Sequence, residues 1–166
     1  MHIIRGRAHL LPEEINTDLH CSAKYMPGQD TAYVAQHAFE QIAPRFVSEF
    51  QAGDVIVAGR NFGINSSREQ AVHALRLLGV AAVVAPAFGR QFFRNAINNG
   101  LPVVECDISG IDQVDTLEID LTVGVLNVLE RGLQRTFPPL PAAIQTLLAA
   151  GGLIPFLQRF PDWKTA

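Results

Sequence analysis

The spacing of apolar residues differs between the middle of the chain and its two ends. Three short apolar runs in the middle are typical of buried strands, at residues 54–59, 80–87 and 101–106. Two segments between these runs have apolar residues at helical spacing and end at a glycine, from about 67 to 78 and from 89 to 100. Alternating strands and helices with short connections predict right-handed crossovers and a parallel sheet.

The flanking segments predict further elements around this core. Residues 2–10 predict an opening strand, and apolar residues at helical spacing predict a helix from Thr31 to Ile42, capped by Asp30 or Thr31. Alternating apolar and polar residues on both sides of Gly124 predict an antiparallel hairpin. The segments 137–152 and 153–160 predict a helix after prolines and a last amphipathic segment. The expected fold is a single α/β domain over residues 1–166.

Composition excludes several classes of function. The net charge is −3 and no basic run is present, which argues against binding to nucleic acid or to an anionic membrane. The longest apolar run, from Leu77 to Phe88, is too short to span a bilayer and is interrupted by glycine and proline. No signal-peptide pattern is present at the N-terminus, so we expect a cytoplasmic protein. Charged residues make up 17%, which fits either a surface covered by a partner or a compact chain with few charges.

Metal-binding patterns are also missing from the sequence. The two cysteines, Cys21 and Cys106, form no CxxC pair and cannot complete the ligand set of an iron–sulfur cluster. No HxH or HExxH spacing occurs either. We therefore expect no metal site within this chain, and a cluster would have to be carried by another chain.

The stretch GRNFGINSSREQA, residues 59–71, is the strongest candidate for a site. It follows a predicted buried strand and leads into a helix, the place where α/β sheets collect ligands. A helix start and Arg68 favour an anion, while Gly63 and Asn65 allow unusual backbone conformations. The segment from Ser66 to Glu69 also fits a capping box, so a plain helix cap and an anion site both remain open.

Together with residues 79–104, this stretch resembles the small-subunit, or swivel, domain of the aconitase superfamily. The greatest similarity is to the small subunits of 3-isopropylmalate dehydratase and of homoaconitase. INTDLHCSAKY, residues 15–25, is similar to that family's TD-containing loop, and residues 137–158 resemble its C-terminal end. The resemblance covers nearly the whole chain and implies a swivelling β/β/α-type domain, with a parallel βαβαβ core and a C-terminal hairpin plus helices.

The resemblance implies a two-chain hydro-lyase that removes water from a 2-hydroxy di- or triacid and adds it back at the neighbouring carbon. A large subunit, in a heterodimer or a heterotetramer, would carry the [4Fe–4S] cluster. The expected reaction converts 2-isopropylmalate to 3-isopropylmalate in leucine biosynthesis. A homoaconitase, another alkylmalate dehydratase and a non-catalytic module that binds an anion or a partner remain alternatives. Ser66 would be the catalytic base, and Ser67 and Arg68 would hold a substrate carboxylate.

Substrate choice in this family is assigned to the segment that here contains Lys24, Tyr25 and Met26. Relatives that act on a third carboxylate tend to carry an arginine just after this point, and its absence here favours a small apolar group such as isopropyl. The neighbouring Lys24 could reverse that inference. The family usually has glycine where Asn65 stands, and the asparagine side chain would crowd or contact the substrate.

Several other residues have both a functional and a structural interpretation. Asp18 either helps to position the substrate or the facing subunit, or it forms an Asx turn. We expect His20 to be solvent-exposed or hydrogen-bonded rather than catalytic, and His73 to form a surface pair with Glu69. Arg94 is a candidate for contact with the large subunit or the substrate. The favoured interpretation is that it only covers the helix surface. The stripe of Ile144, Leu147 and Leu148 fits the core better than an interface. Relatives commonly have alanine where Gly89 stands, a difference that should matter little if Gly89 lies on a packed helix start.

Overall fold

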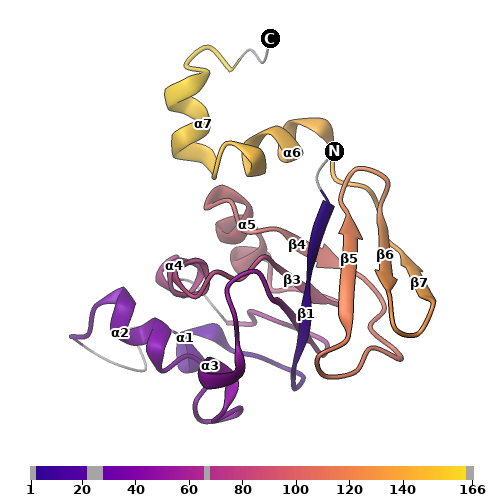
Figure 1. The fold of residues 1–166 in the computed structure, drawn as a ribbon. Helices are drawn as coiled ribbons and strands as arrows, with labels where there is room; N and C mark the ends of the chain where they lie inside the picture. The colour runs from indigo at the N-terminus through magenta and orange to yellow at the C-terminus, as the bar shows by residue number, and fades with distance from the viewer. Residues whose placement is uncertain (1–2, 22–27, 66–67, 164–166) are drawn as a thin grey trace.

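The computed structural model describes residues 3–21, 28–65 and 68–163. Within them, no helix is long and apolar enough to cross a membrane. The elements in chain order are β1 (Ile3–Leu11), α1 (Thr17–His20), α2 (Thr31–Gln36), α3 (Phe46–Glu49), β2 (Val55–Ala58), α4 (Gln70–Leu77), β3 (Ala82–Ala85), α5 (Arg90–Asn98), β4 (Val103–Glu105), β5 (Thr116–Asp120), β6 (Val125–Val128), β7 (Leu133–Thr136), α6 (Ala142–Ala149) and α7 (Leu153–Arg159) (Figure 1).

One mixed sheet organises the described residues, with the strands in the order β4-β3-β2-β1-β5-β6-β7. Strands β1 to β4 are parallel, whereas β5, β6 and β7 are antiparallel. The long strand β1 joins the two halves, because residues 8–11 pair with β2 and residues 3–7 pair with β5. Gly6 is required at this junction, since a β-carbon there would lie 2.1 Å from the carbonyl oxygen of Gly53.

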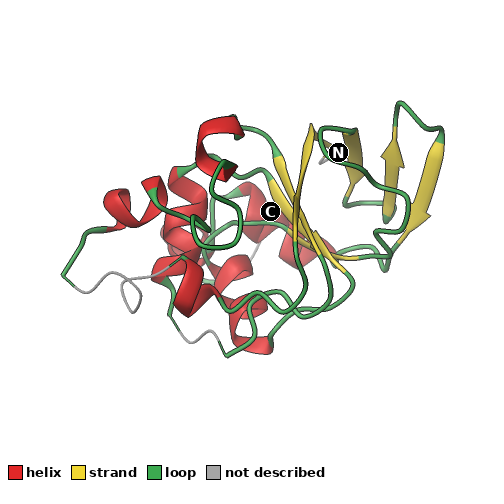
Figure 2. Cartoon of the chain, turned by 90° about the horizontal axis from the view of Figure 1, so that it is seen from below, coloured by secondary structure: helices red, strands yellow, loops and turns green. Residues whose placement is uncertain are grey.

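Helices α4 and α5 connect the parallel strands and pack their apolar faces towards the sheet. The buried positions of α4 recur at helical spacing, as the sequence pattern predicts. Figure 2 shows most helices gathered to one side of the central strands, with the antiparallel strands at the far end of the sheet. The parallel strands lie in the centre of the core, where β2 and β3 are buried at every position, and the helices and antiparallel strands add further buried residues around them.

The predicted α/β fold with its parallel core and antiparallel hairpin is confirmed. The glycines predicted to end the two crossover helices have left-handed φ values, +79° at Gly79 and +74° at Gly100. The stripe of Leu147 and Leu148 is buried, with Ile144 packed against it, as expected. Strand β7 was not predicted.

The predicted helix from 31 to 42 is wrong beyond Gln36. Asp30 caps it as expected, since its Oδ1 accepts a hydrogen bond from the Tyr33 amide at 2.8 Å. The helix ends early because Phe39 has a φ of +61°, and its amide donates to the His20 carbonyl at 2.8 Å. The Phe39 ring is fully buried, so its tertiary packing outweighs the local helical pattern.

A buried polar cluster connects β1 to the start of β2. The carboxylate of Asp54 accepts hydrogen bonds from Arg7 Nη2 at 2.7 Å, from His9 Nε2 at 2.8 Å and from the Gln51 amide at 2.9 Å. Gln113 orients the His9 ring. Its Oε1 accepts a hydrogen bond from the Leu10 amide, so its Nε2 donates towards His9 Nδ1 and leaves His9 Nε2 to donate to Asp54. Burial alone would raise the pKa of Asp54, but the bonds from Arg7, Gln51 and His9 outweigh it and lower the pKa.

We expect Asp54→Asn to lower the free energy of unfolding by about 3 kcal/mol at pH 7, because it breaks a buried, charge-assisted network. The folded pKa of Asp54 lies below its unfolded value. Its contribution to the free energy of unfolding is therefore fully present above about pH 4 and is lost as pH falls through the folded pKa. Urea unfolding from pH 7 to pH 2.5 tests this, with the exposed Asp162→Asn as control. A variant as stable as wild type at pH 7 would contradict the assignment.

Candidate functional site

The stretch 59–69 leaves the carboxyl end of β2 and leads into α4, at the edge of the sheet where the loop after β3 also emerges. Ligands of open α/β sheets bind at this edge. We call the described residues 59–65 the site loop. They lie between two other segments, one from the end of β1 and one from the end of β3.

On the β1 side, one carbonyl group holds two consecutive amides of the site loop. The Ile15 oxygen accepts hydrogen bonds from the Gly63 amide at 2.7 Å and from the Ile64 amide at 3.1 Å. The Glu14 amide donates to the Arg60 oxygen at 2.8 Å. Three backbone bonds therefore attach the loop to residues 14–15.

On the β3 side, the loop is held by a short parallel bridge. The Phe62 amide donates to the Ala87 oxygen at 3.1 Å, and the Gly89 amide donates to the Phe62 oxygen at 2.8 Å. The approach is close, because a β-carbon on Gly89 would lie 2.2 Å from the Gly63 oxygen. The expectation that glycine rather than alanine matters little at position 89 is therefore wrong.

The path of the loop depends on residues in the left-handed region. The φ values are +68° at Asn61, +78° at Gly63 and +53° at Asn65. Asparagine tolerates this region better than most non-glycine residues. The φ of Asn65 confirms the expectation that it can take a left-handed conformation here. Gly63 has a second constraint, since a β-carbon there would lie 2.3 Å from Cβ of Phe92.

The structure does not support the capping-box interpretation of Ser66 to Glu69, one of the two left open by the sequence, although Ser66 itself lies outside the described residues. Helix α4 begins at Gln70, and Glu69 occupies its cap position without a side-chain capping bond. Instead, Glu69 Oε1 accepts a hydrogen bond from Asn99 Nδ2 at 2.7 Å. The opposite atom, Asn99 Oδ1, lies 2.9 Å from His73 Nε2. The expected pair of Glu69 and His73 is thus bridged by Asn99, which forms one hydrogen bond with each side chain.

Two of the predicted site residues, Asp18 and Arg68, are brought together. Asp18 lies in α1 and is only 2% exposed, and its Oδ1 accepts a hydrogen bond from the Arg68 amide at 3.4 Å. Asn16 is the residue that caps this helix, because its Oδ1 accepts from the Asp18 amide at 3.1 Å. The Arg68 side chain is exposed. The other predicted site residues, Lys24, Tyr25, Met26, Ser66 and Ser67, lie outside the described residues.

His20, in the same helix as Asp18, is half-buried. Its Nδ1 is inaccessible to solvent and has no hydrogen-bond partner in the described part of the chain. Burial lowers the pKa of His20, which favours a neutral ring at pH 7. The expectation of a solvent-exposed or hydrogen-bonded ring therefore fails at Nδ1.

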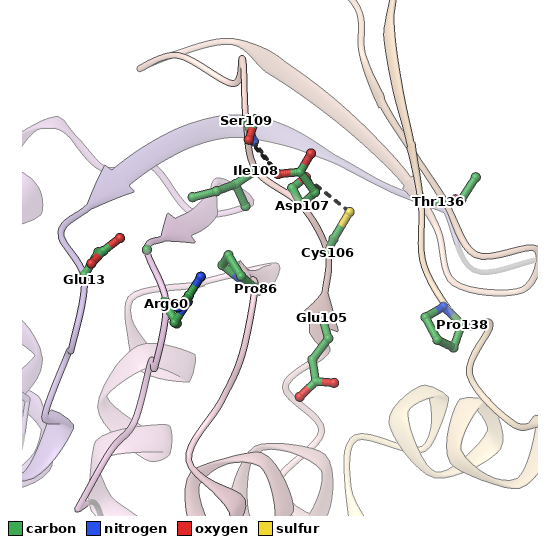
Figure 3. A pocket seen from close by; sticks show the side chains of 11 residues that line it. Glu13, Arg60, Pro86, Glu105, Cys106, Asp107, Ile108, Ser109, Thr136 and Pro138 are labelled. Atoms are coloured by element: carbon green, nitrogen blue, oxygen red, sulfur yellow. Dashed lines mark hydrogen bonds between the residues drawn. The ribbon is translucent and has the colours of Figure 1, made fainter.

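A hollow of about 590 Å³ adjoins the site loop, and sequence analysis did not predict it. Figure 3 shows side chains from the ends of successive parallel strands along it, including Glu13, Arg60, Pro86 and Cys106. Asp107 also lines it, and hydrogen bonds from Ser109, followed by the charge of Arg135, lower its pKa. The available signal was that a charged residue directly follows two of the predicted strands, Arg60 after residues 54–59 and Asp107 after residues 101–106.

The cysteines do not form a metal site. Burial raises the pKa of Cys21 to about 12, and burial also raises the pKa of Cys106, so both remain thiols at neutral pH. Among the described residues, no group of three histidine, cysteine or acidic side chains could hold a metal ion. The donor set of these residues does not fit an iron–sulfur cluster.

Comparison with known proteins places this arrangement in a family. A family model, the aconitase C-terminal domain, matches residues 14–107. The chain is 42% identical over 158 residues to the 3-isopropylmalate dehydratase small subunit of Caldicellulosiruptor bescii, with 94% of this chain and 95% of the relative covered. It is 43% identical over 157 residues to the small subunit of Nautilia profundicola, with 94% and 95% covered.

A solved structure agrees with the sequence comparisons. The crystal structure of a 3-isopropylmalate dehydratase from Methanocaldococcus jannaschii superposes with a TM-score of 0.88 at 37% identity, covering 96% of each chain. The chain belongs to the aconitase C-terminal domain family. Within that family, its similarity is to the small subunits of 3-isopropylmalate dehydratases, which are hydro-lyases.

We expect Gly89→Ala to displace the site loop, because the new methyl group would overlap the Gly63 carbonyl group. The predicted cost is about 1–3 kcal/mol in the free energy of unfolding, together with faster hydrogen exchange at the Phe62 and Gly63 amides. Gly132→Ala is the control, since it has a positive φ but nothing within 4 Å, and it should leave those amides unchanged. Unaltered stability and exchange in Gly89→Ala would show that the contact imposes no constraint.

Proposed function

We propose that this chain is the small subunit of a cytoplasmic, two-chain dehydratase that isomerises 2-isopropylmalate to 3-isopropylmalate in leucine biosynthesis. The observation that carries the proposal is the site loop, which is held at the carboxyl edge of the sheet by Ile15 and Gly89 and leads to Ser66. The relatives at 40% identity or more, named as small subunits of this enzyme, support the same function.

The proposed base is Ser66, which would remove a proton from the carbon next to a substrate carboxylate. A serine hydroxyl needs a stabilised anionic form to do so. Because α4 begins only at Gln70, four residues later, the helix dipole contributes little, and Arg68 becomes the main source of positive charge. Arg68 and Ser67 would hold the carboxylate. Asp18 would support them indirectly, since it accepts the Arg68 amide from a buried position.

The [4Fe–4S] cluster is proposed to belong to the large subunit. The donor set of the described residues supports this division, because the two buried thiols and the absence of a three-ligand group do not fit a cluster here. When bound, such a cluster supplies a Lewis acid for the substrate hydroxyl. The complex would be a heterodimer or a heterotetramer.

The substrate is proposed to have an apolar substituent, in contact with Lys24, Tyr25 and Met26. The sequence carries no arginine directly after Met26, so a third carboxylate would lack its usual partner. One observation favours a different alkylmalate or homocitrate instead. Asn65 is exposed at the end of the site loop, where its side chain could contact the substrate.

The test combines this chain with a cluster-bearing large subunit under anaerobic conditions and follows the unsaturated intermediate formed from 3-isopropylmalate, with homocitrate and citrate alongside. We expect Ser66→Ala to lower kcat by about 10³-fold, because a positioned base contributes on that order, without weakening subunit assembly. Arg68→Lys should raise KM, because a planar, bidentate contact is lost.

Ser48→Ala is the matched control, because Ser48 is exposed and its Oγ donates only to the Arg45 carbonyl, at 2.9 Å. It should retain wild-type kcat. If Ser66→Ala retained wild-type turnover in an intact complex, Ser66 would not be the base. If wild type were inactive on 3-isopropylmalate but active on homocitrate, the substrate assignment would be wrong.

A further inference from the structure

A second hollow, of about 280 Å³, lies beside the site loop at the start of α5. It is lined by Phe88, Arg90, Phe93, Arg94 and Glu105. We call the first four residues the docking face. Both phenylalanines are half-buried and both arginines are exposed. The docking face adjoins the site loop. Gly89 lies between Phe88 and Arg90 in the sequence, and its amide donates a hydrogen bond to the Phe62 carbonyl group of the loop.

The charges on this face are not compensated within the described chain. Arg90 and Arg94 lie one helical turn apart in α5, and neither side chain forms a hydrogen bond or ion pair with a described residue, including Glu105 in the same hollow. Other arginines do find acidic partners, as Arg7 does with Asp54 at 2.7 Å and Arg135 with Asp107 at 3.1 Å. Two adjacent guanidinium groups without partners, in a chain of net charge −3, make a local site for carboxylates.

The aromatic part of the face is continuous with the packing beneath the site loop. The ring centroids of Phe88 and Phe93 are 6.1 Å apart, and those of Phe62 and Phe88 are 6.2 Å apart. Phe62, fully buried, packs on Phe92 with centroids 4.9 Å apart, and Phe92 is the residue that a side chain at Gly63 would strike. One aromatic cluster therefore reaches from the surface of the docking face to the floor of the site loop.

We propose that the docking face binds the large subunit, through a segment that carries carboxylates next to an apolar side chain. This inference rests on the proposed function, in which a partner completes the site at the loop. Carboxylates would pair with Arg90 and Arg94, and the apolar side chain would pack against Phe88 and Phe93. Half-exposed aromatic residues together with arginines are the residue types enriched at the centres of interfaces.

Binding at this face also has a consequence for the site. Covering Phe88 and Phe93 removes solvent from the surface end of the aromatic cluster, whose buried end supports Gly63. Assembly and the conformation of the site loop are therefore connected through the packing of side chains. The arginines act on assembly, so turnover at saturating large subunit does not depend on them.

Single charge reversals test the proposal, because exposed arginines can be replaced with little risk to the fold. Arg90→Glu and Arg94→Glu are each expected to raise the Kd for a cluster-bearing large subunit by about 10-fold at 50 mM salt. The wild-type Kd should rise with salt, and the variants should depend on salt less. Assays with 3-isopropylmalate should show unchanged kcat once enough large subunit is added.

Arg45→Glu is the matched control, since this side chain is 84% exposed, lies at the start of α3 and undergoes the same change of charge. It should change Kd by less than about 2-fold, as expected for a charge outside the interface. Arg94→Gln, which removes the charge without reversing it, should fall between wild type and Arg94→Glu. Thermal unfolding of each variant separates a loss of folding from a loss of binding.

The outcomes distinguish this inference from the proposed function. If wild type forms an active complex and both reversals bind with the wild-type Kd, the docking face is wrong and the function stands. If the complexes assemble normally and only KM for 3-isopropylmalate rises, the arginines attract the substrate and the docking face is again wrong. If wild type neither binds a large subunit nor supports turnover, the proposed function itself fails.

Discussion

The carbonyl group of Ile15 is the point on which the site depends, because it accepts the amides of Gly63 and Ile64 together. That contact requires the chain after β1 to pass beside the loop after β2. The two strands satisfy this requirement through their parallel register, which pairs Leu11 with Ala58 at their carboxyl ends. The buried network around Asp54 fixes the same two strands at the opposite end of their pairing. The sheet thus positions the loop before any partner binds.

On its other side, the site loop lies against the segment that follows β3, and this close backbone approach explains the glycines at positions 63 and 89. Gly89 and Gly63 meet without side chains between them, and the Phe62 amide and oxygen both bond to the β3 segment. The aromatic residues beneath fill the space that these glycines leave. The site loop, residues 59–65, is thus held from two sides and from below, and the catalysis proposed for the residues that follow it would require defined positions.

Local patterns predicted the elements whose structure is locally determined. The apolar runs identified β2, β3 and β4, and their alternation with helices predicted the parallel core. Non-local contacts decided the rest. The pairing of β1 with β5 brings together segments more than a hundred residues apart, and Phe39 ends α2 because its ring is buried against distant residues. The candidate site shows the same division, since the loop was found from its sequence, whereas the Asn99 bridge and the contact of Gly89 with Gly63 are visible only in three dimensions.

Hydrogen–deuterium exchange of the isolated chain would test most directly whether the chain itself holds the site loop. We expect the Gly63, Ile64 and Phe62 amides to be protected to an extent similar to the amides of β2, because each has a backbone acceptor. The exposed amide of an unbonded surface residue gives the reference for free exchange. If the three loop amides exchanged at that free rate, and slowed only after the large subunit was added, the partner rather than the sheet would shape the site.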